Sequence, residues 1–281
     1  MELWQRTASL QVGAKKYRME DFQFEFEVPF EDSETLQEAA FRIYNLNENS
    51  RMEIRRGHAV ILNAGYENDL GVIFIGQVSA CSHQHNGTDW LTNITAVAAM
   101  DEWLNRKVNK TYMQNMTAKD IIPDLLNIFG LEVGEFELAV NKNYPRGRVC
   151  QGKVKDVLID IAVNECRSRF LIKDNSIIIN NQAKGTVTGY VLTPESGLLL
   201  SGGETEETVI AVGIDSRKDA GEKEGEGSYI TRECLLNYRI KPADQIKIQS
   251  RTLNGNFHVI RGRHTGSPAG AWKTVMELQP Y

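Results

Sequence analysis

The sequence has few of the residues that usually mark an active site or a cofactor site. Its 281 residues include five histidines and four cysteines, and no two cysteines form a Cys-x-x-Cys pair. Zinc knuckles and redox dithiols are therefore not supported, and buried free thiols in a reducing compartment are expected. The Gly-x-Ser-x-Gly and His-Glu-x-x-His signatures are missing as well. These absences argue against the common hydrolase and metalloprotease classes.

Long apolar runs and a large charge excess are also missing. No stretch approaches the roughly 20 apolar residues of a membrane helix. The segment Met1–Tyr17 has no apolar core of the kind found in a signal peptide. The formal net charge is −5, so composition gives no electrostatic argument for stable nucleic-acid binding. We expect a soluble protein that is made in the cytoplasm.

The histidines are the first candidates for chemistry. His83 and His85 share one face of an extended segment with Cys81, an arrangement that could hold a metal. A plain strand-end pair is the commoner meaning of so short a motif. His258 and His264 have the setting of surface or barrel-rim residues rather than of an acid–base pair.

Glycine-rich stretches are the second candidates. Gly202-Gly203 and Gly221–Gly227 lack both the Lys-Ser or Lys-Thr ending and the strand–turn–helix setting of a phosphate loop. We therefore predict no catalytic residue, no cofactor and no metal ligand, and a protein that is not an enzyme.

The first third of the chain reads as strands. In Asp21–Phe30, phenylalanines and valine alternate with glutamine and glutamates, as in a strand with one buried face. Similar signals predict strands at Phe41–Leu46, Gly57–Gly65, Gly71–Ser79 and Asp89–Ala99. A helical turn is predicted at Asn47–Arg55.

The middle of the chain changes to helical spacing. Thr117–Phe129 predicts a helix with Thr117 and Asp120 at its start and Gly130 after its end, although Pro123 could strain the first turn or delay the start. Lys153–Ser168 predicts a second amphipathic helix, and Phe170–Asn180 a hairpin turning at Asp174-Asn175.

Strands return from about Gly189. The charged loop Arg217–Ser228 is expected to be solvated, with partner binding as the alternative. The C-terminal strands are predicted at Ile246–Thr252, Phe257–Arg261 and Trp272–Leu278, with a turn at Asn254–Asn256 and a loop at Thr265–Gly270.

The two ends of the chain share a layout. An apolar strand, a polar loop with glycine and a strand opening with Trp-x-Thr occur around Trp90 and again around Trp272. We predict a mainly β protein in which two tube-type barrels, residues 1–112 and 186–281, flank a central α+β module, residues 113–185.

Short motifs in a fixed order resemble a known family. In the first barrel they are an Ile-Tyr-Asn-Leu strand at Ile43–Leu46, an Ala-Gly-Tyr strand end at Ala64–Tyr66, a strand at Ile73–Gly76 and a Gly-Thr-Asp-Trp strand at Gly87–Trp90. Further matches lie at Val157–Ala162, Phe170–Ile179, Ser196–Leu199 and Leu235–Ser250. With the C-terminal strands, this pattern resembles the tail baseplate hub proteins of phages and prophages, which include the T-even hub, late control protein D and the N-terminal part of tail-tip proteins.

The resemblance implies a structural function. Three copies would form a pseudo-sixfold ring that adapts the tail tube to a central spike, in a virion tail or phage-like particle assembled in the bacterial host cytoplasm. Implied partners are two further copies, the spike protein, and a tube or distal tail protein, with the tape-measure protein as an additional candidate. No appended enzyme is expected after Tyr281, and contractile and non-contractile tails both stay open.

Two alternatives from other classes remain. One is a tail-tip protein that binds or cleaves cell-wall carbohydrate or peptidoglycan, and the other is a small-ligand β-barrel. Within the hub interpretation, the acidic face of the strand with Glu25 and Glu27 could face the ring lumen, where it would repel DNA phosphates. The plainer interpretation is a half-buried strand with a wet acidic face.

Overall fold

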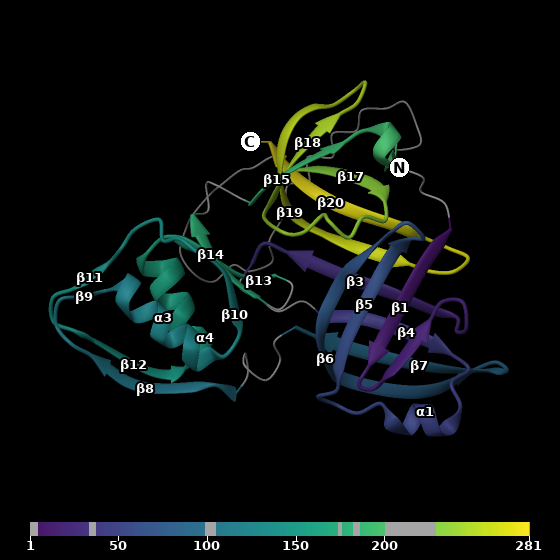
Figure 1. Cartoon of the computed structure of the whole chain (residues 1–281), viewed down its shortest axis with the longest axis horizontal. Helices are drawn as coiled ribbons and strands as arrows, with labels where there is room; N and C mark the ends of the chain where they lie inside the picture. The colour runs from purple at the N-terminus through teal and green to yellow at the C-terminus, as the bar shows by residue number, and fades with distance from the viewer. Residues whose placement is uncertain are drawn as a thin grey trace, which may run out of the picture.

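A computed structural model describes residues 5–33, 38–98, 105–173, 176–181, 186–199 and 229–280. Among these residues, one 13-stranded sheet runs through both ends of the chain, and the middle forms a separate body of helices and small sheets (Figure 1). The mainly β fold class with an α+β middle is thus confirmed. In the described part of the chain, no helix has the length and apolar character needed to cross a membrane.

The N-terminal strands form what we call the first barrel. They are β1 (Arg6–Val12), β2 (Lys15–Arg18), β3 (Phe24–Glu31), β4 (Glu38–Tyr44), β5 (Ala59–Tyr66), β6 (Asp69–Asn86) and β7 (Asp89–Val97). They lie in the antiparallel order β3-β4-β7-β6-β5-β1-β2. The alternation in β3 buries Phe24, Phe26 and Val28 and turns Glu25 and Glu27 outward, as the sequence predicts.

A short helix packs on the first barrel. Helix α1 (Glu48–Glu53) follows the cap residue Asn47, whose side chain accepts a hydrogen bond from the Ser50 N–H at 2.8 Å. An asparagine cap satisfies an amide that the first helical turn leaves without a partner.

The central module packs two helices against short strands. Helix α3 (Ala118–Phe129) begins directly after Thr117, rather than later as Pro123 allowed, and Gly130 ends it in the left-handed conformation. Helix α4 (Val154–Ile159) continues as a π-helical segment, Asp160–Glu165. The strands are β8 (Lys107–Tyr112), β9 (Met116–Thr117), β10 (Glu132–Phe136), β11 (Asn143–Tyr144), β12 (Arg148–Lys153), β13 (Ser168–Lys173) and β14 (Ser176–Asn181).

The limits between the three parts stay predictions. Strand β8 lies before the predicted limit at 112, yet it pairs with β12, and its Val108 and Tyr112 are in the central apolar cluster. We propose that this limit lies before Lys107. The predicted turn at Asp174-Asn175 lies outside the described residues.

The C-terminal strands form the second barrel. They are β15 (Thr186–Leu192), β16 (Leu198–Leu199), β17 (Ile230–Leu235), β18 (Asp244–Gln249), β19 (Asn254–Gly266) and β20 (Trp272–Pro280). Their order is β16-β17-β20-β19-β18-β15. All pairs are antiparallel except β15 with β18.

The predicted Asn254–Asn256 turn is wrong. The turn lies at Ser250–Leu253, where the Leu253 N–H donates to the Ser250 hydroxyl oxygen at 2.9 Å and the Asn254 side-chain amide donates to the Ser250 C=O at 2.8 Å. These bonds close the turn earlier, so that Asn254 already pairs with Gln249. Strands β6 and β19 also run past their predicted ends because backbone pairing continues where the side chains are polar.

The two barrels repeat one strand order, although β1 is antiparallel to β5 whereas its counterpart β15 is parallel to β18. Strands β3, β4, β7, β6, β5 and β1 have the same neighbours as β16, β17, β20, β19, β18 and β15. A register shift lies between Val78 and Ala80 in β6 and between Val259 and Arg261 in β19, just after Val78 faces Ala96 and Val259 faces Leu278. A β-bulge at the same place in both barrels is a specific feature rather than a generic hairpin plan.

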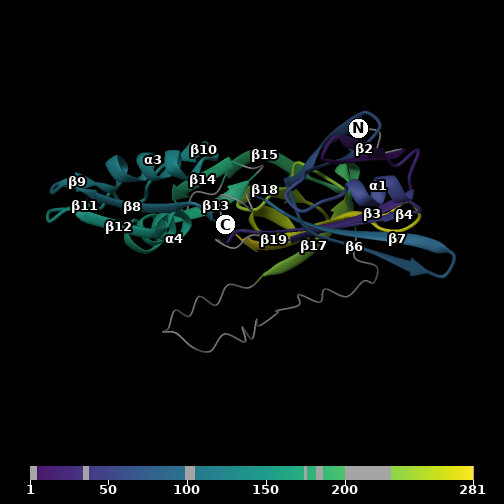
Figure 2. The ribbon, with the colours of Figure 1, turned by 90° about the horizontal axis from the view of Figure 1, so that it is seen from below.

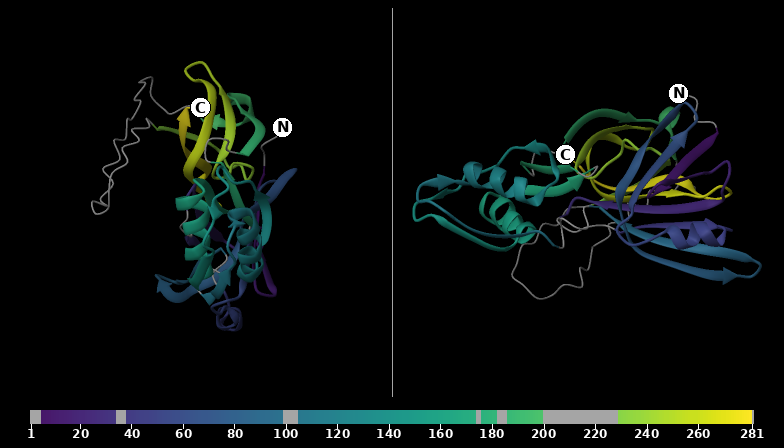
Figure 3. Two further views of the ribbon diagram at one scale, coloured as in Figure 1. Left: turned by 90° about the vertical axis from the view of Figure 1, so that its left-hand side faces the viewer. Right: turned by 60° about the horizontal axis from the view of Figure 1, so that its bottom comes forward.

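The barrels are joined by their backbones. The last part of β3 pairs with the last part of β19, from Glu31 opposite Arg261 to Phe26 opposite Gly266. The central module lies to one side of both barrels, and the tip of the β6–β7 hairpin projects on the opposite side (Figures 2 and 3).

Ion pairs fix the three parts together. Asp69 of β6 receives two hydrogen bonds from the Arg239 guanidinium, both at 2.6 Å, across the barrel junction. Arg169 contacts Asp32 at 2.9 Å, and Lys173 contacts Asp244 at 2.5 Å, between the central module and the barrels.

Candidate functional surfaces

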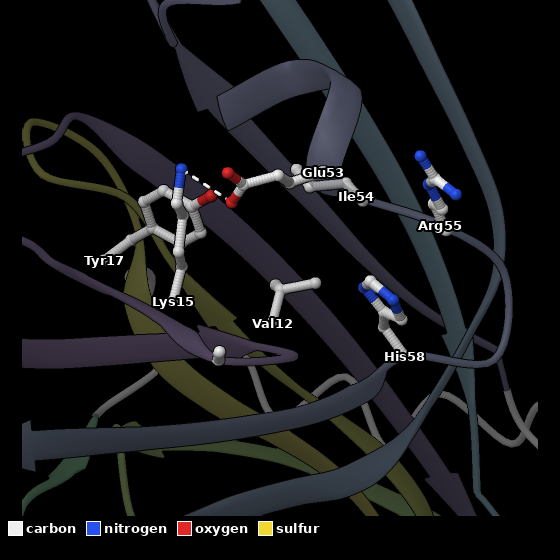
Figure 4. A pocket seen from close by; sticks show the side chains of 8 residues that line it. Val12, Lys15, Tyr17, Glu53, Ile54, Arg55 and His58 are labelled. Carbon is white, nitrogen blue, oxygen red and sulfur yellow. Dashed lines mark ion pairs between the residues drawn. The ribbon is translucent and has the colours of Figure 1, made fainter. Parts of the chain in front are cut away.

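A hollow of about 290 Å³ lies between the β1–β2 turn and α1. Val12 lies at its floor, Lys15, Tyr17 and Glu53 line one side, and Arg55 and His58 line the other (Figure 4). Lys15 forms an ion pair with Glu53 at 2.7 Å. Burial, with Glu53 nearby, raises the pKa of Tyr17, so its hydroxyl stays protonated. The residues that line the hollow include no nucleophile beside a base and no pair of free carboxylates, so the hollow does not support a catalytic role.

Cys81, His83 and His85 lie near the end of strand β6 and contact residues of β6 and β7. The His83 ring contacts the Thr92 hydroxyl at 3.2 Å and lies 3.8 Å from the Cys81 sulfur. The His85 ring packs on Trp90, with 3.7 Å between ring centroids. Within the described residues, no group of three possible metal ligands exists. The structure therefore favours the plainer interpretation of this motif.

His264 is not a surface or rim residue, contrary to the prediction. It is 2% exposed, its ring contacts the Thr274 hydroxyl at 2.8 Å, and Phe30 packs on it at 4.8 Å between centroids. Burial, with Lys241 nearby, lowers the pKa of His264 to about 3, so the ring is neutral. The reason for the misprediction is that β3, far away in the sequence, covers this part of β19.

The cysteines are free thiols. Cys150, Cys166 and Cys234 are buried, and Cys81 is half-buried. Burial raises the pKa of Cys234 to about 12. A thiol that stays protonated is a poor nucleophile.

One face of the joined sheet is strongly charged. The outward side chains of β4, β3, β19, β20 and β17 include Glu25, Glu27, Glu31, Glu38, Glu233, Glu277, Arg42, Arg261, Arg263 and Lys273. Glu25 lies 3.8 Å from Arg42, and Glu27 lies 4.0 Å from Arg263. The acidic row of β3 is therefore flanked by cations from both neighbouring strands.

A tight polar cluster of the central module was missed by sequence reasoning. The Arg148 guanidinium donates to Glu165 and to Asp160, which are the ends of the π-helical segment, and the Tyr144 hydroxyl donates to the same Glu165. Residues five apart lie on different faces of an α-helix, whereas the wider π-turn brings them together. No sequence signal predicts a π-turn. Each of the four side chains bonds to at least one other, which indicates a structural role for the cluster.

The remaining candidates lie outside the described residues. These are Gly202-Gly203, Gly221–Gly227 and the loop Arg217–Ser228.

The sequence matches no family model and no curated protein. Solved structures do match. A tail protein from Neisseria meningitidis aligns over 98% of this chain and 97% of its own, with a TM-score of 0.65 and 11% identity. A 43 kDa tail protein of prophage MuSo2 from Shewanella oneidensis aligns over 98% and 96%, with a TM-score of 0.67 and 11% identity.

A third similar structure comes from a secretion machine. It is a component of the E. coli type VI secretion system, described as structurally similar to two tail proteins of bacteriophage T4. It aligns over 97% of this chain and 76% of its own, with a TM-score of 0.58 and 13% identity. The chain therefore has the fold of phage and prophage tail proteins over nearly its whole length.

Proposed function

We propose that the protein is a structural hub of a phage or phage-like tail. Three copies form a ring of six similar units, which adapts a sixfold tube to a threefold spike. The observation that carries this proposal is the repeat of strand order and β-bulge in the two barrels of one chain. Three chains with two similar barrels each give six similar units, so a threefold assembly has approximate sixfold symmetry. Head-to-tail contacts between the chains can close such a ring.

The partners follow from this position. They are two further copies, a central spike protein, and a tube or distal tail protein, with the tape-measure protein as an additional candidate. The location is the tail of a virion or phage-like particle after assembly in the host cytoplasm. The protein is not an enzyme in this proposal, which is supported by the packing of His83, His85 and His264 against neighbouring side chains. Burial also raises the pKa of the three buried thiols, so that they stay protonated.

The charged sheet face is the proposed wall of the channel. It spans both barrels without a break, because β3 and β19 are hydrogen-bonded to each other. Glutamates outnumber cations on it, and a net negative wall repels DNA phosphates at short range. The arginines beside Glu25 and Glu27 make this repulsion weaker than an unpaired acidic row would give.

Two measurements test the hub. Native mass spectrometry of the protein, alone and mixed with a candidate spike protein, should give three copies per assembly. Cryo-electron microscopy of that assembly should place Glu25 and Glu27 in the lumen. A monomer that ignores the spike protein and hydrolyses peptidoglycan would contradict the proposal and favour the cell-wall alternative.

A further inference from the structure

We propose that the hollow between the β1–β2 turn and α1 receives the carboxylate of an aspartate or glutamate side chain from an adjoining protein. This inference rests on the proposed hub, because the adjoining protein is then a neighbour in the tail. Its test uses the isolated protein and gives a result whether or not three copies assemble. The observation that carries it is a buried hydroxyl group without a partner.

Tyr17 lines the hollow with this hydroxyl. The residue is 3% exposed, and its hydroxyl oxygen has no hydrogen-bond partner among the described residues. The ring packs edge-on against Phe22, with 5.3 Å between the ring centroids, and belongs to the apolar cluster of the first barrel. Phenylalanine would pack in the same way without burying an unpaired polar group, which costs free energy. The hydroxyl is therefore positioned to bond a group that enters the hollow.

Two donors meet on this side of the hollow. Burial, with Glu53 nearby, raises the pKa of Tyr17, so its hydroxyl stays protonated and can donate. Lys15 lies beside it (Figure 4). The Lys15 ammonium donates to the Ser50 hydroxyl oxygen at 3.2 Å and pairs with Glu53 at 2.7 Å, which engages two of its three N–H groups. The third N–H and the Tyr17 O–H can both be given to one acceptor group.

The opposite side of the hollow is cationic. Arg55 and His58 line it (Figure 4), and the Arg55 side chain is exposed and has no ion pair among the described residues. With Lys15 and Arg55 as cations and Glu53 as the anion, the lining has a net charge of +1 before His58 is counted. A carboxylate, with one negative charge, balances this lining. A phosphate group would bring nearly two charges close to Glu53 and be repelled more strongly.

The size and the floor of the hollow fit a short acidic side chain. The volume of about 290 Å³ is at the lower end of the range for small-ligand sites, roughly 300–1,000 Å³. Val12 and Ile54, both buried, contribute apolar surface to it. The methylene groups of a glutamate or aspartate can pack on this surface while the carboxylate oxygens accept hydrogen bonds from Tyr17 and Lys15.

The surroundings of the hollow have the composition of a protein interface. Met52, the neighbour of Glu53 in α1, is 68% exposed. Arg55 and Arg56 are exposed as well. Methionine and arginine are enriched in protein–protein interfaces, where side chains that fill a pocket supply much of the binding energy. An acidic side chain presented by a protein surface is therefore the occupant that these residues fit.

The stability of the protein without a ligand tests whether the hydroxyl is unpartnered. Tyr17→Phe should unfold at the same urea concentration as wild type or at a higher one, since no hydrogen bond within the fold is lost. Tyr112→Phe is the matched control, because the Tyr112 hydroxyl donates to Asp124, and it should unfold at a lower concentration. Equal destabilisation by the two substitutions would overturn the inference, because the Tyr17 hydroxyl would then have a partner inside the protein.

Binding is measured with two blocked peptides, acetyl-Gly-Glu-Gly-amide and the same peptide with Gln in place of Glu. Protein labelled with 3-fluorotyrosine gives a fluorine resonance for Tyr17, which is assigned by its absence from Tyr17→Phe. The Glu peptide should shift this resonance saturably, with a Kd in about the millimolar range expected for one anchoring side chain. The Gln peptide should bind at least about tenfold more weakly, because hydrogen bonds to a charged acceptor are stronger.

Variants connect binding to the named donors, with saturation transfer to the Glu peptide as the readout. Tyr17→Phe should weaken binding about tenfold or more, as expected for one lost hydrogen bond to a carboxylate. Arg55→Gln should weaken it about fivefold, the effect of an ion pair near the surface. Arg56→Gln is the matched control, because Arg56 is exposed but does not line the hollow, and it should bind like wild type.

The results that would overturn the inference are distinct from those that would contradict the hub. Equal binding of the two peptides, binding that Tyr17→Phe leaves unchanged, or no saturable shift at about ten times the expected Kd would each overturn it. Binding of glutarate without binding of the Glu peptide would assign the hollow to a free acid and overturn the docking of a side chain. A protein that binds the Glu peptide but never forms a trimer supports the carboxylate site and contradicts the hub.

Discussion

At the scale of the residue, burial determines the pKa of a histidine. The His83–Thr92 and His264–Thr274 pairs have the same chemistry and the same place in their hairpins. Among the described strands, β3 covers His264 and none covers His83, and the pKa of His264 is about 3 because burial disfavours the charged ring. Stability that depends on this neutral ring is present above the pKa of an unfolded histidine, about 6.5. It is lost as the pH falls below that value.

This difference predicts a pH effect. Between pH 6.5 and 5, His264 alone should lower the free energy of unfolding by about 2 kcal/mol, since each pH unit corresponds to about 1.4 kcal/mol. Urea titrations at several pH values should show that His264→Gln removes this slope, whatever its effect on absolute stability. His83→Gln, at the exposed equivalent position, is the control and should keep most of the slope. An unchanged slope in His264→Gln would contradict the buried neutral ring.

At the scale of the element, β19 belongs to both barrels. It pairs with β18 through its first half, with β3 through its second half and with β20 along most of its length. Where β3 crosses, this crowding leaves no room for a side chain at Gly262 or Gly266, which lie against Phe30 and Phe26. At Gly262 a Cβ would meet the Val275 carbonyl oxygen at 2.3 Å. Glycine here is required by close approach of neighbouring strands, not by turn geometry.

Gly262→Ala therefore should destabilise the protein by about 1–3 kcal/mol or more, because backbone and a packed ring must both move. Gly255→Ala in the same strand is the matched control. Its Cβ would have its nearest neighbour at 3.4 Å, an ordinary contact, and stability should change little. Chemical denaturation of both variants provides the measurement, and equal effects would show that β3 does not lie as close to β19 as described.

At the scale of the whole molecule, the barrels share their cores. Phe30 of the first barrel lies in the apolar cluster of the second barrel. Leu236 and Trp272 of the C-terminal part lie in the cluster of the first barrel. Because of this exchange and the bidentate Asp69–Arg239 pair, we expect the two barrels to unfold together.

Phe30→Ala tests this exchange. It should destabilise the protein by about 3–5 kcal/mol, the usual cost of truncating a buried phenylalanine. Amide hydrogen exchange should accelerate in β18 and β20, far from Phe30 in the sequence. Val133→Ala in the central module removes a side chain that is 42% exposed and should change neither quantity. Faster exchange confined to residues 5–98 would contradict the shared core.

The sequence by itself determined the local elements of this protein. Alternating phenylalanines and glutamates produced β3, Thr117, Asp120 and Gly130 delimited α3, and two Trp-x-Thr strands pointed to a repeated barrel. These features depend on neighbours in the chain, so period and capping chemistry suffice to predict them. The prediction of a turn at Asn254-Gly255 was wrong because hydrogen bonds of the Ser250 side chain close the turn earlier in the chain.

Only the tertiary structure decided which surfaces are covered. Two equivalent histidines acquired opposite environments because β3 reaches β19 from more than 200 residues away, while no described strand reaches the same edge of β6. The pairing of distant strands depends on free backbone groups and matched shapes, which are common to many sequences. Hence the sequence predicts the strands and the repeat, whereas the crossing of β3 and the shared cores follow from the fold alone.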